Sequence, residues 1–82
     1  MTVRKTYYPF EGDLSISDSS LAYVKILMVT RSGLQFNVIP YTSSFPPPDE
    51  RTCLYNNSDG SIVFVINFNS NESINVIYET NP

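Results

Sequence analysis

The sequence contains no histidine, a single cysteine, Cys53, and three glycines. Most enzymes that move protons use a histidine, and phosphate-binding loops need several glycines close together. Cys53 lies in an apolar segment and has no histidine to activate it, so we expect a small core residue rather than a nucleophile. One cysteine also excludes an internal disulfide, and without histidine it cannot complete a zinc site. We therefore expect a protein that is not an enzyme and that uses no cofactor.

Charged residues are also scarce, at 16% of the chain against the usual quarter of a globular domain. Much of the polarity comes from 19 serine and asparagine residues, which cost less free energy than ions when they leave water. Such side chains suit a surface that contacts other proteins. The net charge is -3 and the five basic residues are scattered, so we expect no binding of nucleic acid.

No apolar run in the sequence is long enough to cross a bilayer, because uncharged apolar runs such as residues 26–29 and 62–66 are far too short. The first residues also lack the apolar stretch of a signal peptide. We therefore expect a protein that is made in the cytoplasm without a signal peptide and that does not associate with a membrane.

Acidic residues fall mainly in segments that we expect to be loops. Glu11, Asp13 and Asp18 lie close together in the sequence and offer the oxygen ligands that calcium prefers. Their spacing does not match the calcium-binding loop of an EF-hand, so a solvated loop is the simpler interpretation. A calcium ion in this loop stays open as the alternative.

The most informative segment is 62–68, which reads Ile-Val-Phe-Val-Ile-Asn-Phe. Alternate side chains of a strand point to opposite faces, so Phe64 would lie on one face and Val63 and Val65 on the other. Both faces would then be apolar, whereas a small antiparallel sheet usually has one dry and one solvated face. A domain of this size buries only about 60 to 65% of its unfolded surface, so we expect other protein chains to cover part of this strand.

Apolar alternation and turn residues predict five or six short strands and no helix. Residues 31–33, Arg-Ser-Gly, fit a hairpin turn, and three consecutive prolines stiffen the loop at 42–51. The expected strands cover residues 2–8, 21–30, 34–41, 52–56, 62–68 and 73–79. The predicted fold is all-β, a small antiparallel sandwich or partly open barrel with an N-terminal arm. Residues 1–20 are expected to form that arm or an edge strand, and residues 21–82 a single β domain.

Several aromatic residues lie at expected strand ends or in loops, where a ring can contact a partner protein or a sugar. Capping of a thin core is the alternative role for such rings. Val63 and Val65 add an apolar face on the second side of their expected strand. The candidate interface residues are Tyr7, Tyr8, Phe10, Phe45, Val63 and Val65.

These features predict a non-enzymatic structural subunit that oligomerises within a larger assembly. The expected partners are other protein subunits, because a homo-oligomer, a trimer or larger, would cover the open sheet edges of a small β protein. The general character of the sequence is typical of small virion components such as head decorations, fibre bases and tail adaptors, so incorporation in a virion is part of this prediction. One alternative is a monomeric module that binds a glycan or peptide. Another is an enzyme inhibitor that uses the stiff loop at 45–51 as a wedge.

Overall fold

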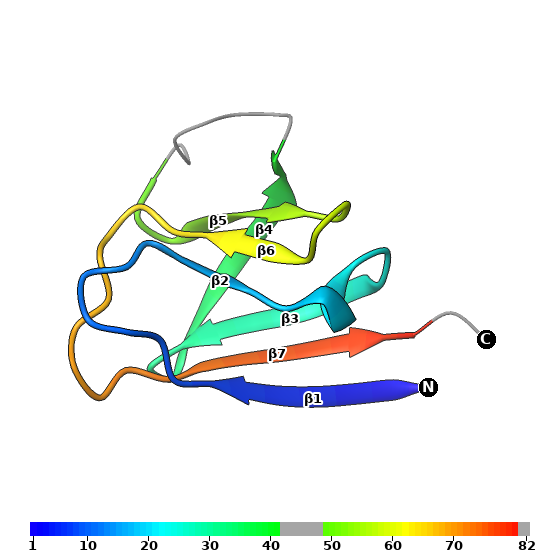
Figure 1. Ribbon diagram of the computed structural model, residues 1–82, viewed down its shortest axis with the longest axis horizontal. Coiled ribbons are helices and arrows are strands. Elements are labelled where there is room, and N and C mark those ends of the chain that lie inside the picture. The colour runs from blue at the N-terminus through cyan, green and yellow to red at the C-terminus, as the bar shows by residue number, and fades with distance from the viewer. Residues whose placement is uncertain (42–48, 81–82) are drawn as a thin grey trace.

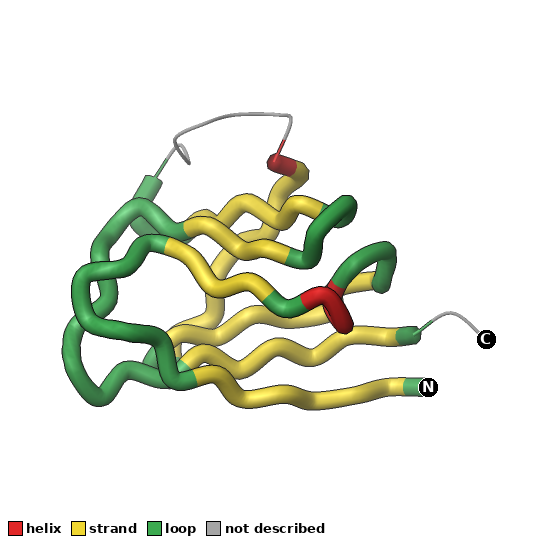
Figure 2. Tube along the Cα trace, in the orientation of Figure 1, coloured by secondary structure: helices red, strands yellow, loops and turns green. Residues whose placement is uncertain are grey.

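The computed structural model describes residues 1–41 and 49–80 of the chain. Seven strands form one sheet that curls into a half-barrel, in the spatial order β1-β7-β3-β4-β5-β6-β2 (Figure 1 and Figure 2). The strands are β1 (Thr2–Tyr7), β2 (Ser15–Ser17), β3 (Lys25–Arg31), β4 (Leu34–Pro40), β5 (Thr52–Asn56), β6 (Ser61–Val63) and β7 (Ile74–Glu79). A short 3-10 helix, η1 (Ser19–Leu21), precedes β3.

The predicted all-β fold is confirmed. Of the two expected forms, an antiparallel sandwich or a partly open barrel, the structure has a half-barrel, and its sheet is mixed rather than antiparallel. The structure has seven strands rather than five or six, and residues 15–17 form a short strand, β2, that the sequence did not clearly mark. Neighbouring strands are antiparallel except β4 and β5, which are parallel. Parallel neighbours cannot be joined by a tight turn, and the long connection between these two strands meets that need.

Alternation along the strands places the core inside the curl. Ile74, Val76 and Tyr78 of β7 are buried, and the residues between them are half-buried. Phe36 of β4 stacks edge-to-face on Phe64, with 5.3 Å between the ring centroids, and joins the sheet to the connection that follows β6. The core cluster comprises Ile16, Leu21, Val29, Phe36, Cys53, Ile62, Phe64, Phe68, Ile74, Val76 and Tyr78.

The apolar segment 62–68 is not one strand. β6 ends at Val63, and the following residues cross one end of the half-barrel. Phe64 and Phe68 are buried in the core, whereas Ile66 is 44% exposed. The N–H of Phe64 donates to the carbonyl of Leu14 and extends the register of β2 and β6 by one position. The N–H of Phe68 donates to the carbonyl of Asp13, so beyond Phe64 contacts with the connection between β1 and β2 replace the ladder. The predicted strand through Phe68, apolar on both faces, is therefore wrong.

A strand that is buried on both faces does occur, but it is β5. Cys53 of this strand belongs to the core cluster. Leu54 is also fully buried, although it points to the opposite face and lies outside that cluster. Its direct neighbours in the register are Ile39 of β4 and Val63 of β6, which are half-buried. The outer face of the sheet therefore carries a second apolar contact at this point.

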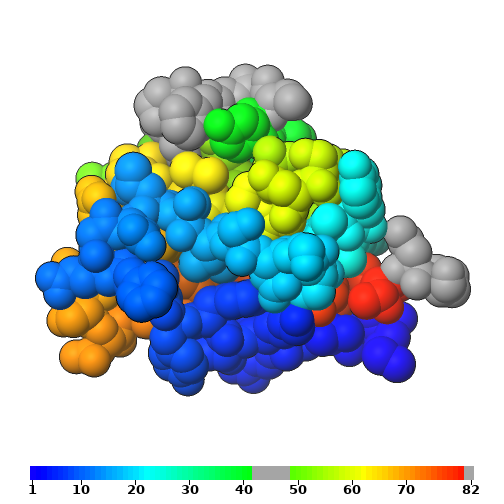
Figure 3. Space-filling model, in the orientation of Figure 1, coloured from blue at the N-terminus to red at the C-terminus, as the bar shows by residue number. Residues whose placement is uncertain are grey.

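The first 20 residues supply both edges of the sheet. β1 pairs along its full length with β7, and β2 pairs with β6 at the other edge. Of the two alternatives for this region, an arm or an edge strand, the structure has the edge strand. Figure 3 shows the two blue segments together on one face of the molecule, because the curl brings the edges of the sheet toward each other.

Candidate interaction surface

Among the described residues, the curled sheet has two edges without a partner strand, and the longer one belongs to β1. The N–H of Thr80 donates to the carbonyl of Met1 at 2.9 Å. In an antiparallel pair, such hydrogen-bonded positions alternate with positions whose backbone groups face the other way. By this alternation, the backbone N–H and C=O groups of Thr2, Arg4 and Thr6 point away from β7.

β2 presents a second, shorter edge. The N–H of Phe64 donates to the carbonyl of Leu14 at 2.8 Å, and the N–H of Asp18 donates to the carbonyl of Gly60 at 3.3 Å. The same alternation then turns the backbone groups of Ser15 and Ser17 away from β6. We call the gap between the free edges of β1 and β2 the barrel seam.

Asp18 bridges the barrel seam with its carboxylate. Its Oδ2 atom accepts hydrogen bonds from the hydroxyl of Tyr7 at 2.7 Å and from Nζ of Lys5 at 3.2 Å. Its Oδ1 atom accepts from the N–H and the hydroxyl of Ser20, at 2.9 and 2.8 Å. Side chains rather than backbone groups therefore join the two edges.

The bridge shifts the titration of both its acidic members. The hydrogen bond from Tyr7, followed by those from Ser20, holds the pKa of Asp18 well below its usual value. Burial, followed by the hydrogen bond to Asp18, raises the pKa of Tyr7 well above the usual value for a tyrosine. At neutral pH the bridge therefore consists of a charged carboxylate and a protonated phenol.

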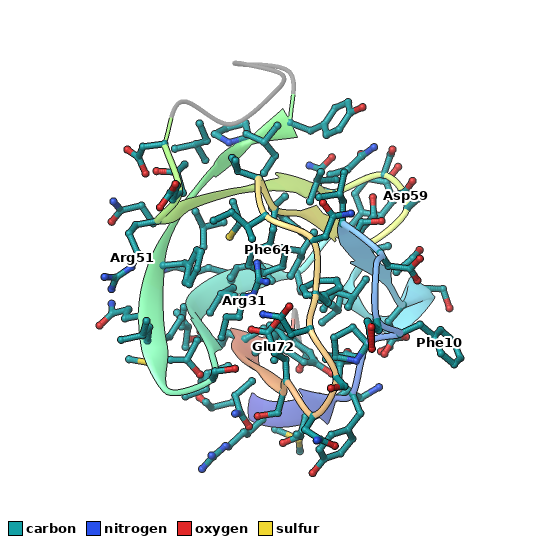
Figure 4. All side chains as sticks on the ribbon, turned by 90° about the vertical axis from the view of Figure 1, so that its left-hand side faces the viewer. Phe10, Arg31, Arg51, Asp59, Phe64 and Glu72 are labelled. Carbon is teal, nitrogen blue, oxygen red and sulfur yellow. The ribbon has the colours of Figure 1, made fainter. Side chains whose placement is uncertain are left out.

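Two exposed aromatic residues directly follow β1. Tyr8 is 78% exposed and Phe10 is 81% exposed. Phe10 projects away from the barrel, as Figure 4 shows. Aromatic side chains that stand free of the core are typical anchors of protein interfaces, because they bury a large area at a small entropy cost.

The other predicted interface residues have different positions. Tyr7 is half-buried and packs against the core while its hydroxyl binds Asp18. Val63 and Val65 are both half-buried, so neither stands fully open to solvent. Phe45 lies outside the described residues. The structure therefore brings Tyr8 and Phe10 together with the edge of β1, and it does not add the two valines to that surface.

A buried ion pair holds the end of the half-barrel that segment 64–68 crosses. Arg31 is 6% exposed, and its guanidinium binds both carboxylate oxygens of Glu72, from Nε at 2.9 Å and from Nη2 at 2.8 Å. The guanidinium also donates to the carbonyls of Ile66 and Asn67 at 2.8 and 2.9 Å. Its carbon lies 4.8 Å from the ring centroid of Phe68. We call this group the Arg31–Glu72 clamp (Figure 4).

The clamp lies beside a shallow hollow of about 210 Å³. Leu34 and Ile66, which are 55% and 44% exposed, line it together with Phe36. Arg51 lies over the ring of Phe36, with its guanidinium carbon 5.6 Å from the centroid. The hollow is therefore lined by both apolar and charged side chains.

Within residues 1–41 and 49–80, no three side chains of His, Cys, Asp or Glu converge as metal ligands would. Burial raises the pKa of the Cys53 thiol to about 12, so this thiol is neutral at physiological pH. The described residues also contain no helix with the length and apolar character needed to span a membrane.

Sequence reasoning did not identify Asp18, Arg31 or Glu72 as structural anchors. Each reads as an ordinary residue of a turn or loop. A weak signal existed for two of them, because Arg31 and Glu72 each border one of the long uncharged stretches of the chain. A charge that flanks so much apolar sequence needs a partner when the chain folds.

Comparison of the chain with models of known protein families, with curated proteins and with solved structures gives no match.

Proposed function

We propose that the protein is a non-enzymatic structural subunit that assembles with other copies of itself along the free edge of β1. The observation that supports this function is the six-residue edge of β1, whose outward backbone groups pair with no described residue. An unpaired edge of this kind is a template for a strand of another chain. Tyr8 and Phe10, which directly follow β1, extend the same surface with exposed rings.

Charge on β1 limits which strands can pair with it. Lysine and arginine on an edge strand commonly oppose edge-to-edge pairing. Lys5 is already paired with Asp18 at 3.2 Å, so its charge is compensated within one protomer. Arg4 is exposed, and its guanidinium makes a hydrogen bond of 3.4 Å to Asn75. Two Arg4 side chains directly opposite each other would repel, so Arg4 restricts the register.

The longest antiparallel register between two copies of β1 that avoids this contact has Lys5 on the two-fold axis. Arg4 then lies opposite Thr6, and both turn their free backbone groups toward the other copy. Tyr8 lies opposite Thr2 at the end of this ladder. The two Lys5 ammonium groups meet near the axis, each paired with the Asp18 carboxylate of its own protomer.

Assembly beyond a pair requires a second contact surface. Leu34 and Ile66, which are exposed beside the Arg31–Glu72 clamp, are the candidates for that contact, which would join two-fold pairs into a closed assembly with an even number of copies, larger than a trimer. A small virion component such as a head decoration, fibre base or tail adaptor is the finer form of the same proposal. The general character of the sequence supports that finer form.

Sedimentation velocity of the purified chain at about 1 to 100 µM tests the proposal. We expect a mass above the 9.3 kDa of one chain that falls on dilution. The Thr6→Pro variant lacks an N–H group that faces the free edge but keeps the ladder with β7, so it should associate at least about tenfold more weakly.

Thr6→Val is the matched control. It loses the same hydrogen bond from the Thr6 hydroxyl to Asn75, at 2.7 Å, but keeps the backbone N–H. A wild-type chain that stays monomeric at the highest concentration contradicts the proposal. Equal association of Thr6→Pro and Thr6→Val would contradict the use of this edge.

A further inference from the structure

A second hollow, of about 310 Å³, lies where the parallel strands β4 and β5 both end. Pro40 and Tyr41 line it from the end of β4, and Tyr55, Asn56 and Asn57 line it from the end of β5. It is lined by other residues than the seam and the Arg31–Glu72 clamp, so it is independent of the surface proposed for assembly. Its volume is at the lower end of the range for small-molecule sites, which suits a ligand of one ring.

The walls of this hollow are held in place by hydrogen bonds. The hydroxyl of Tyr55 donates to the carbonyl of Leu21 and accepts from the N–H of Val24 at 3.3 Å, so the ring is anchored at its far end. The carbonyl of Asn57 accepts from the N–H of Tyr23 at 2.9 Å. Anchored walls lose little conformational entropy when a ligand binds.

The amide of Asn56 is oriented by its neighbour. Its Oδ1 atom accepts from the N–H and the hydroxyl of Ser58, at 3.1 and 2.7 Å. The NH₂ group is then the end of the amide that remains available, and it makes no hydrogen bond to a described residue. The side chain of Asn57 is exposed and likewise makes no hydrogen bond to a described residue.

The chemistry of the lining selects among ligand classes. None of the lining residues carries a formal charge, so an ionic ligand would lose its hydration without gaining a counter-charge. A wholly apolar ligand would cover the two amides and leave them unpaired. A ligand with an apolar face and a rim of hydroxyl groups satisfies both the tyrosine rings and the amides.

We propose that this hollow binds a neutral sugar ring, either free or as the terminal unit of a glycan. The apolar face of the ring packs against the tyrosine side of the hollow. Its hydroxyl groups accept hydrogen bonds from the amides of Asn56 and Asn57. The site requires no metal ion and no second protomer.

Titration of ¹⁵N-labelled protein with neutral sugars, followed by NMR, tests this site. The probes are glucose, galactose, mannose and N-acetylglucosamine, each raised to about 50 mM, because a single ring with few contacts is expected to bind with millimolar affinity. For at least one probe we expect saturable shifts of the amide signals of Tyr41, Tyr55, Asn56 and Asn57. Glucuronic acid, the charged analogue of glucose, should bind more weakly than glucose.

Two variants separate this site from general surface effects. Asn56→Asp keeps the oxygen that binds Ser58 but replaces the NH₂ donor with a charged acceptor, so we expect about tenfold weaker binding. Asn57→Ala removes an exposed side chain and should weaken binding without affecting the fold. Asn71→Asp is the control, because it makes the same charge change in the turn before β7.

Absence of saturable shifts at these residues with all four sugars overturns the proposal. Tighter binding of glucuronic acid than of glucose also overturns it, because the ligand would then be an anion. Unchanged affinity in both Asn56→Asp and Asn57→Ala would place the sugar elsewhere. The oligomeric state measured by sedimentation does not enter this test, so the two proposals fail separately.

Discussion

Replacing Glu72 with glutamine would break the Arg31–Glu72 clamp while keeping the size of the side chain. In the wild type, the carboxylate binds the guanidinium of Arg31 through two oxygens and accepts the N–H of Asn69 at 2.6 Å. In Glu72→Gln, the guanidinium keeps the carbonyls of Ile66 and Asn67 but loses its counter-charge. The side chain of Arg31 is 7% exposed, so water cannot replace what is lost.

The expected cost follows from this burial. Removing one member of a fully buried ion pair costs about 3 to 5 kcal/mol, and water reaches Glu72 from one side because its side chain is 14% exposed. We therefore expect Glu72→Gln to lower the free energy of unfolding by about 2 to 3 kcal/mol. A domain of 82 residues has about 4 to 12 kcal/mol in total, so the Tm should fall by about 10 to 20 °C.

The stabilisation by the Arg31–Glu72 ion pair should also depend on pH. The hydrogen bonds from Arg31 lower the pKa of Glu72 from its usual 4.5 to about 2. Because the pKa is lower in the folded state, the pair stabilises the fold above pH 4.5, and this contribution is lost as the pH falls toward 2. The difference in stability between wild type and Glu72→Gln should therefore shrink over that range.

Urea unfolding followed by circular dichroism measures both effects. Glu79→Gln is the matched control, because Glu79 is exposed on β7 and loses the same charge. We expect that control to change the free energy of unfolding by less than about 0.5 kcal/mol. If Glu72→Gln is no less stable than Glu79→Gln, the clamp does not stabilise the fold and the reasoning is refuted.

Two further predictions concern Gly60 and Cys53. A methyl group on Gly60 (φ 78°) would lie 2.1 Å from the carbonyl oxygen of Asp18, whereas one on Gly33 (φ 85°) would meet no atom within 4 Å. In urea unfolding, Gly33→Ala should therefore lower the free energy of unfolding by about 1 kcal/mol, because of backbone strain. Gly60→Ala should lower it by at least about 2 kcal/mol more, because two packed segments must also separate. Equal losses in the two variants would contradict the close approach of Gly60 to Asp18. Cys53 is fully buried, so a thiol reagent at about pH 8 should react only after unfolding in urea, and rapid labelling of the folded chain would contradict its burial.

Several strands could be predicted from the sequence because their local signals agree. Alternation of apolar residues and flanking turn residues predicted strands at 34–41, 52–56 and 73–79, and the structure has β4, β5 and β7 there. Contacts distant in the sequence changed two other predicted strands. The first four residues of the predicted strand at 21–30 lie outside β3, since the hydroxyl of Tyr55 and the carbonyl of Asn57 hold them in place. The predicted strand at 62–68 ends at Val63, and the N–H of Phe68 donates to the carbonyl of Asp13 instead.

The candidate surface was predictable in part. Tyr8 and Phe10 were identified because aromatic residues at a strand end or in a loop can contact a partner, and both are exposed. The barrel seam was not predictable, because the position of an edge depends on the order of the strands. The Arg31–Glu72 clamp joins residues 41 positions apart, and no local pattern relates them.

Composition and local periodicity are enough to establish a small all-β protein with few charges and without a histidine, because neither depends on contacts between distant residues. The edge strands, the backbone groups that pair with no described residue and the apolar residues that reach the surface are known only from the folded arrangement. Those properties depend on how the sheet curls and on which charges meet inside it. For this reason, the surface proposed for assembly and the hollow proposed for a sugar are properties of the fold rather than of any motif.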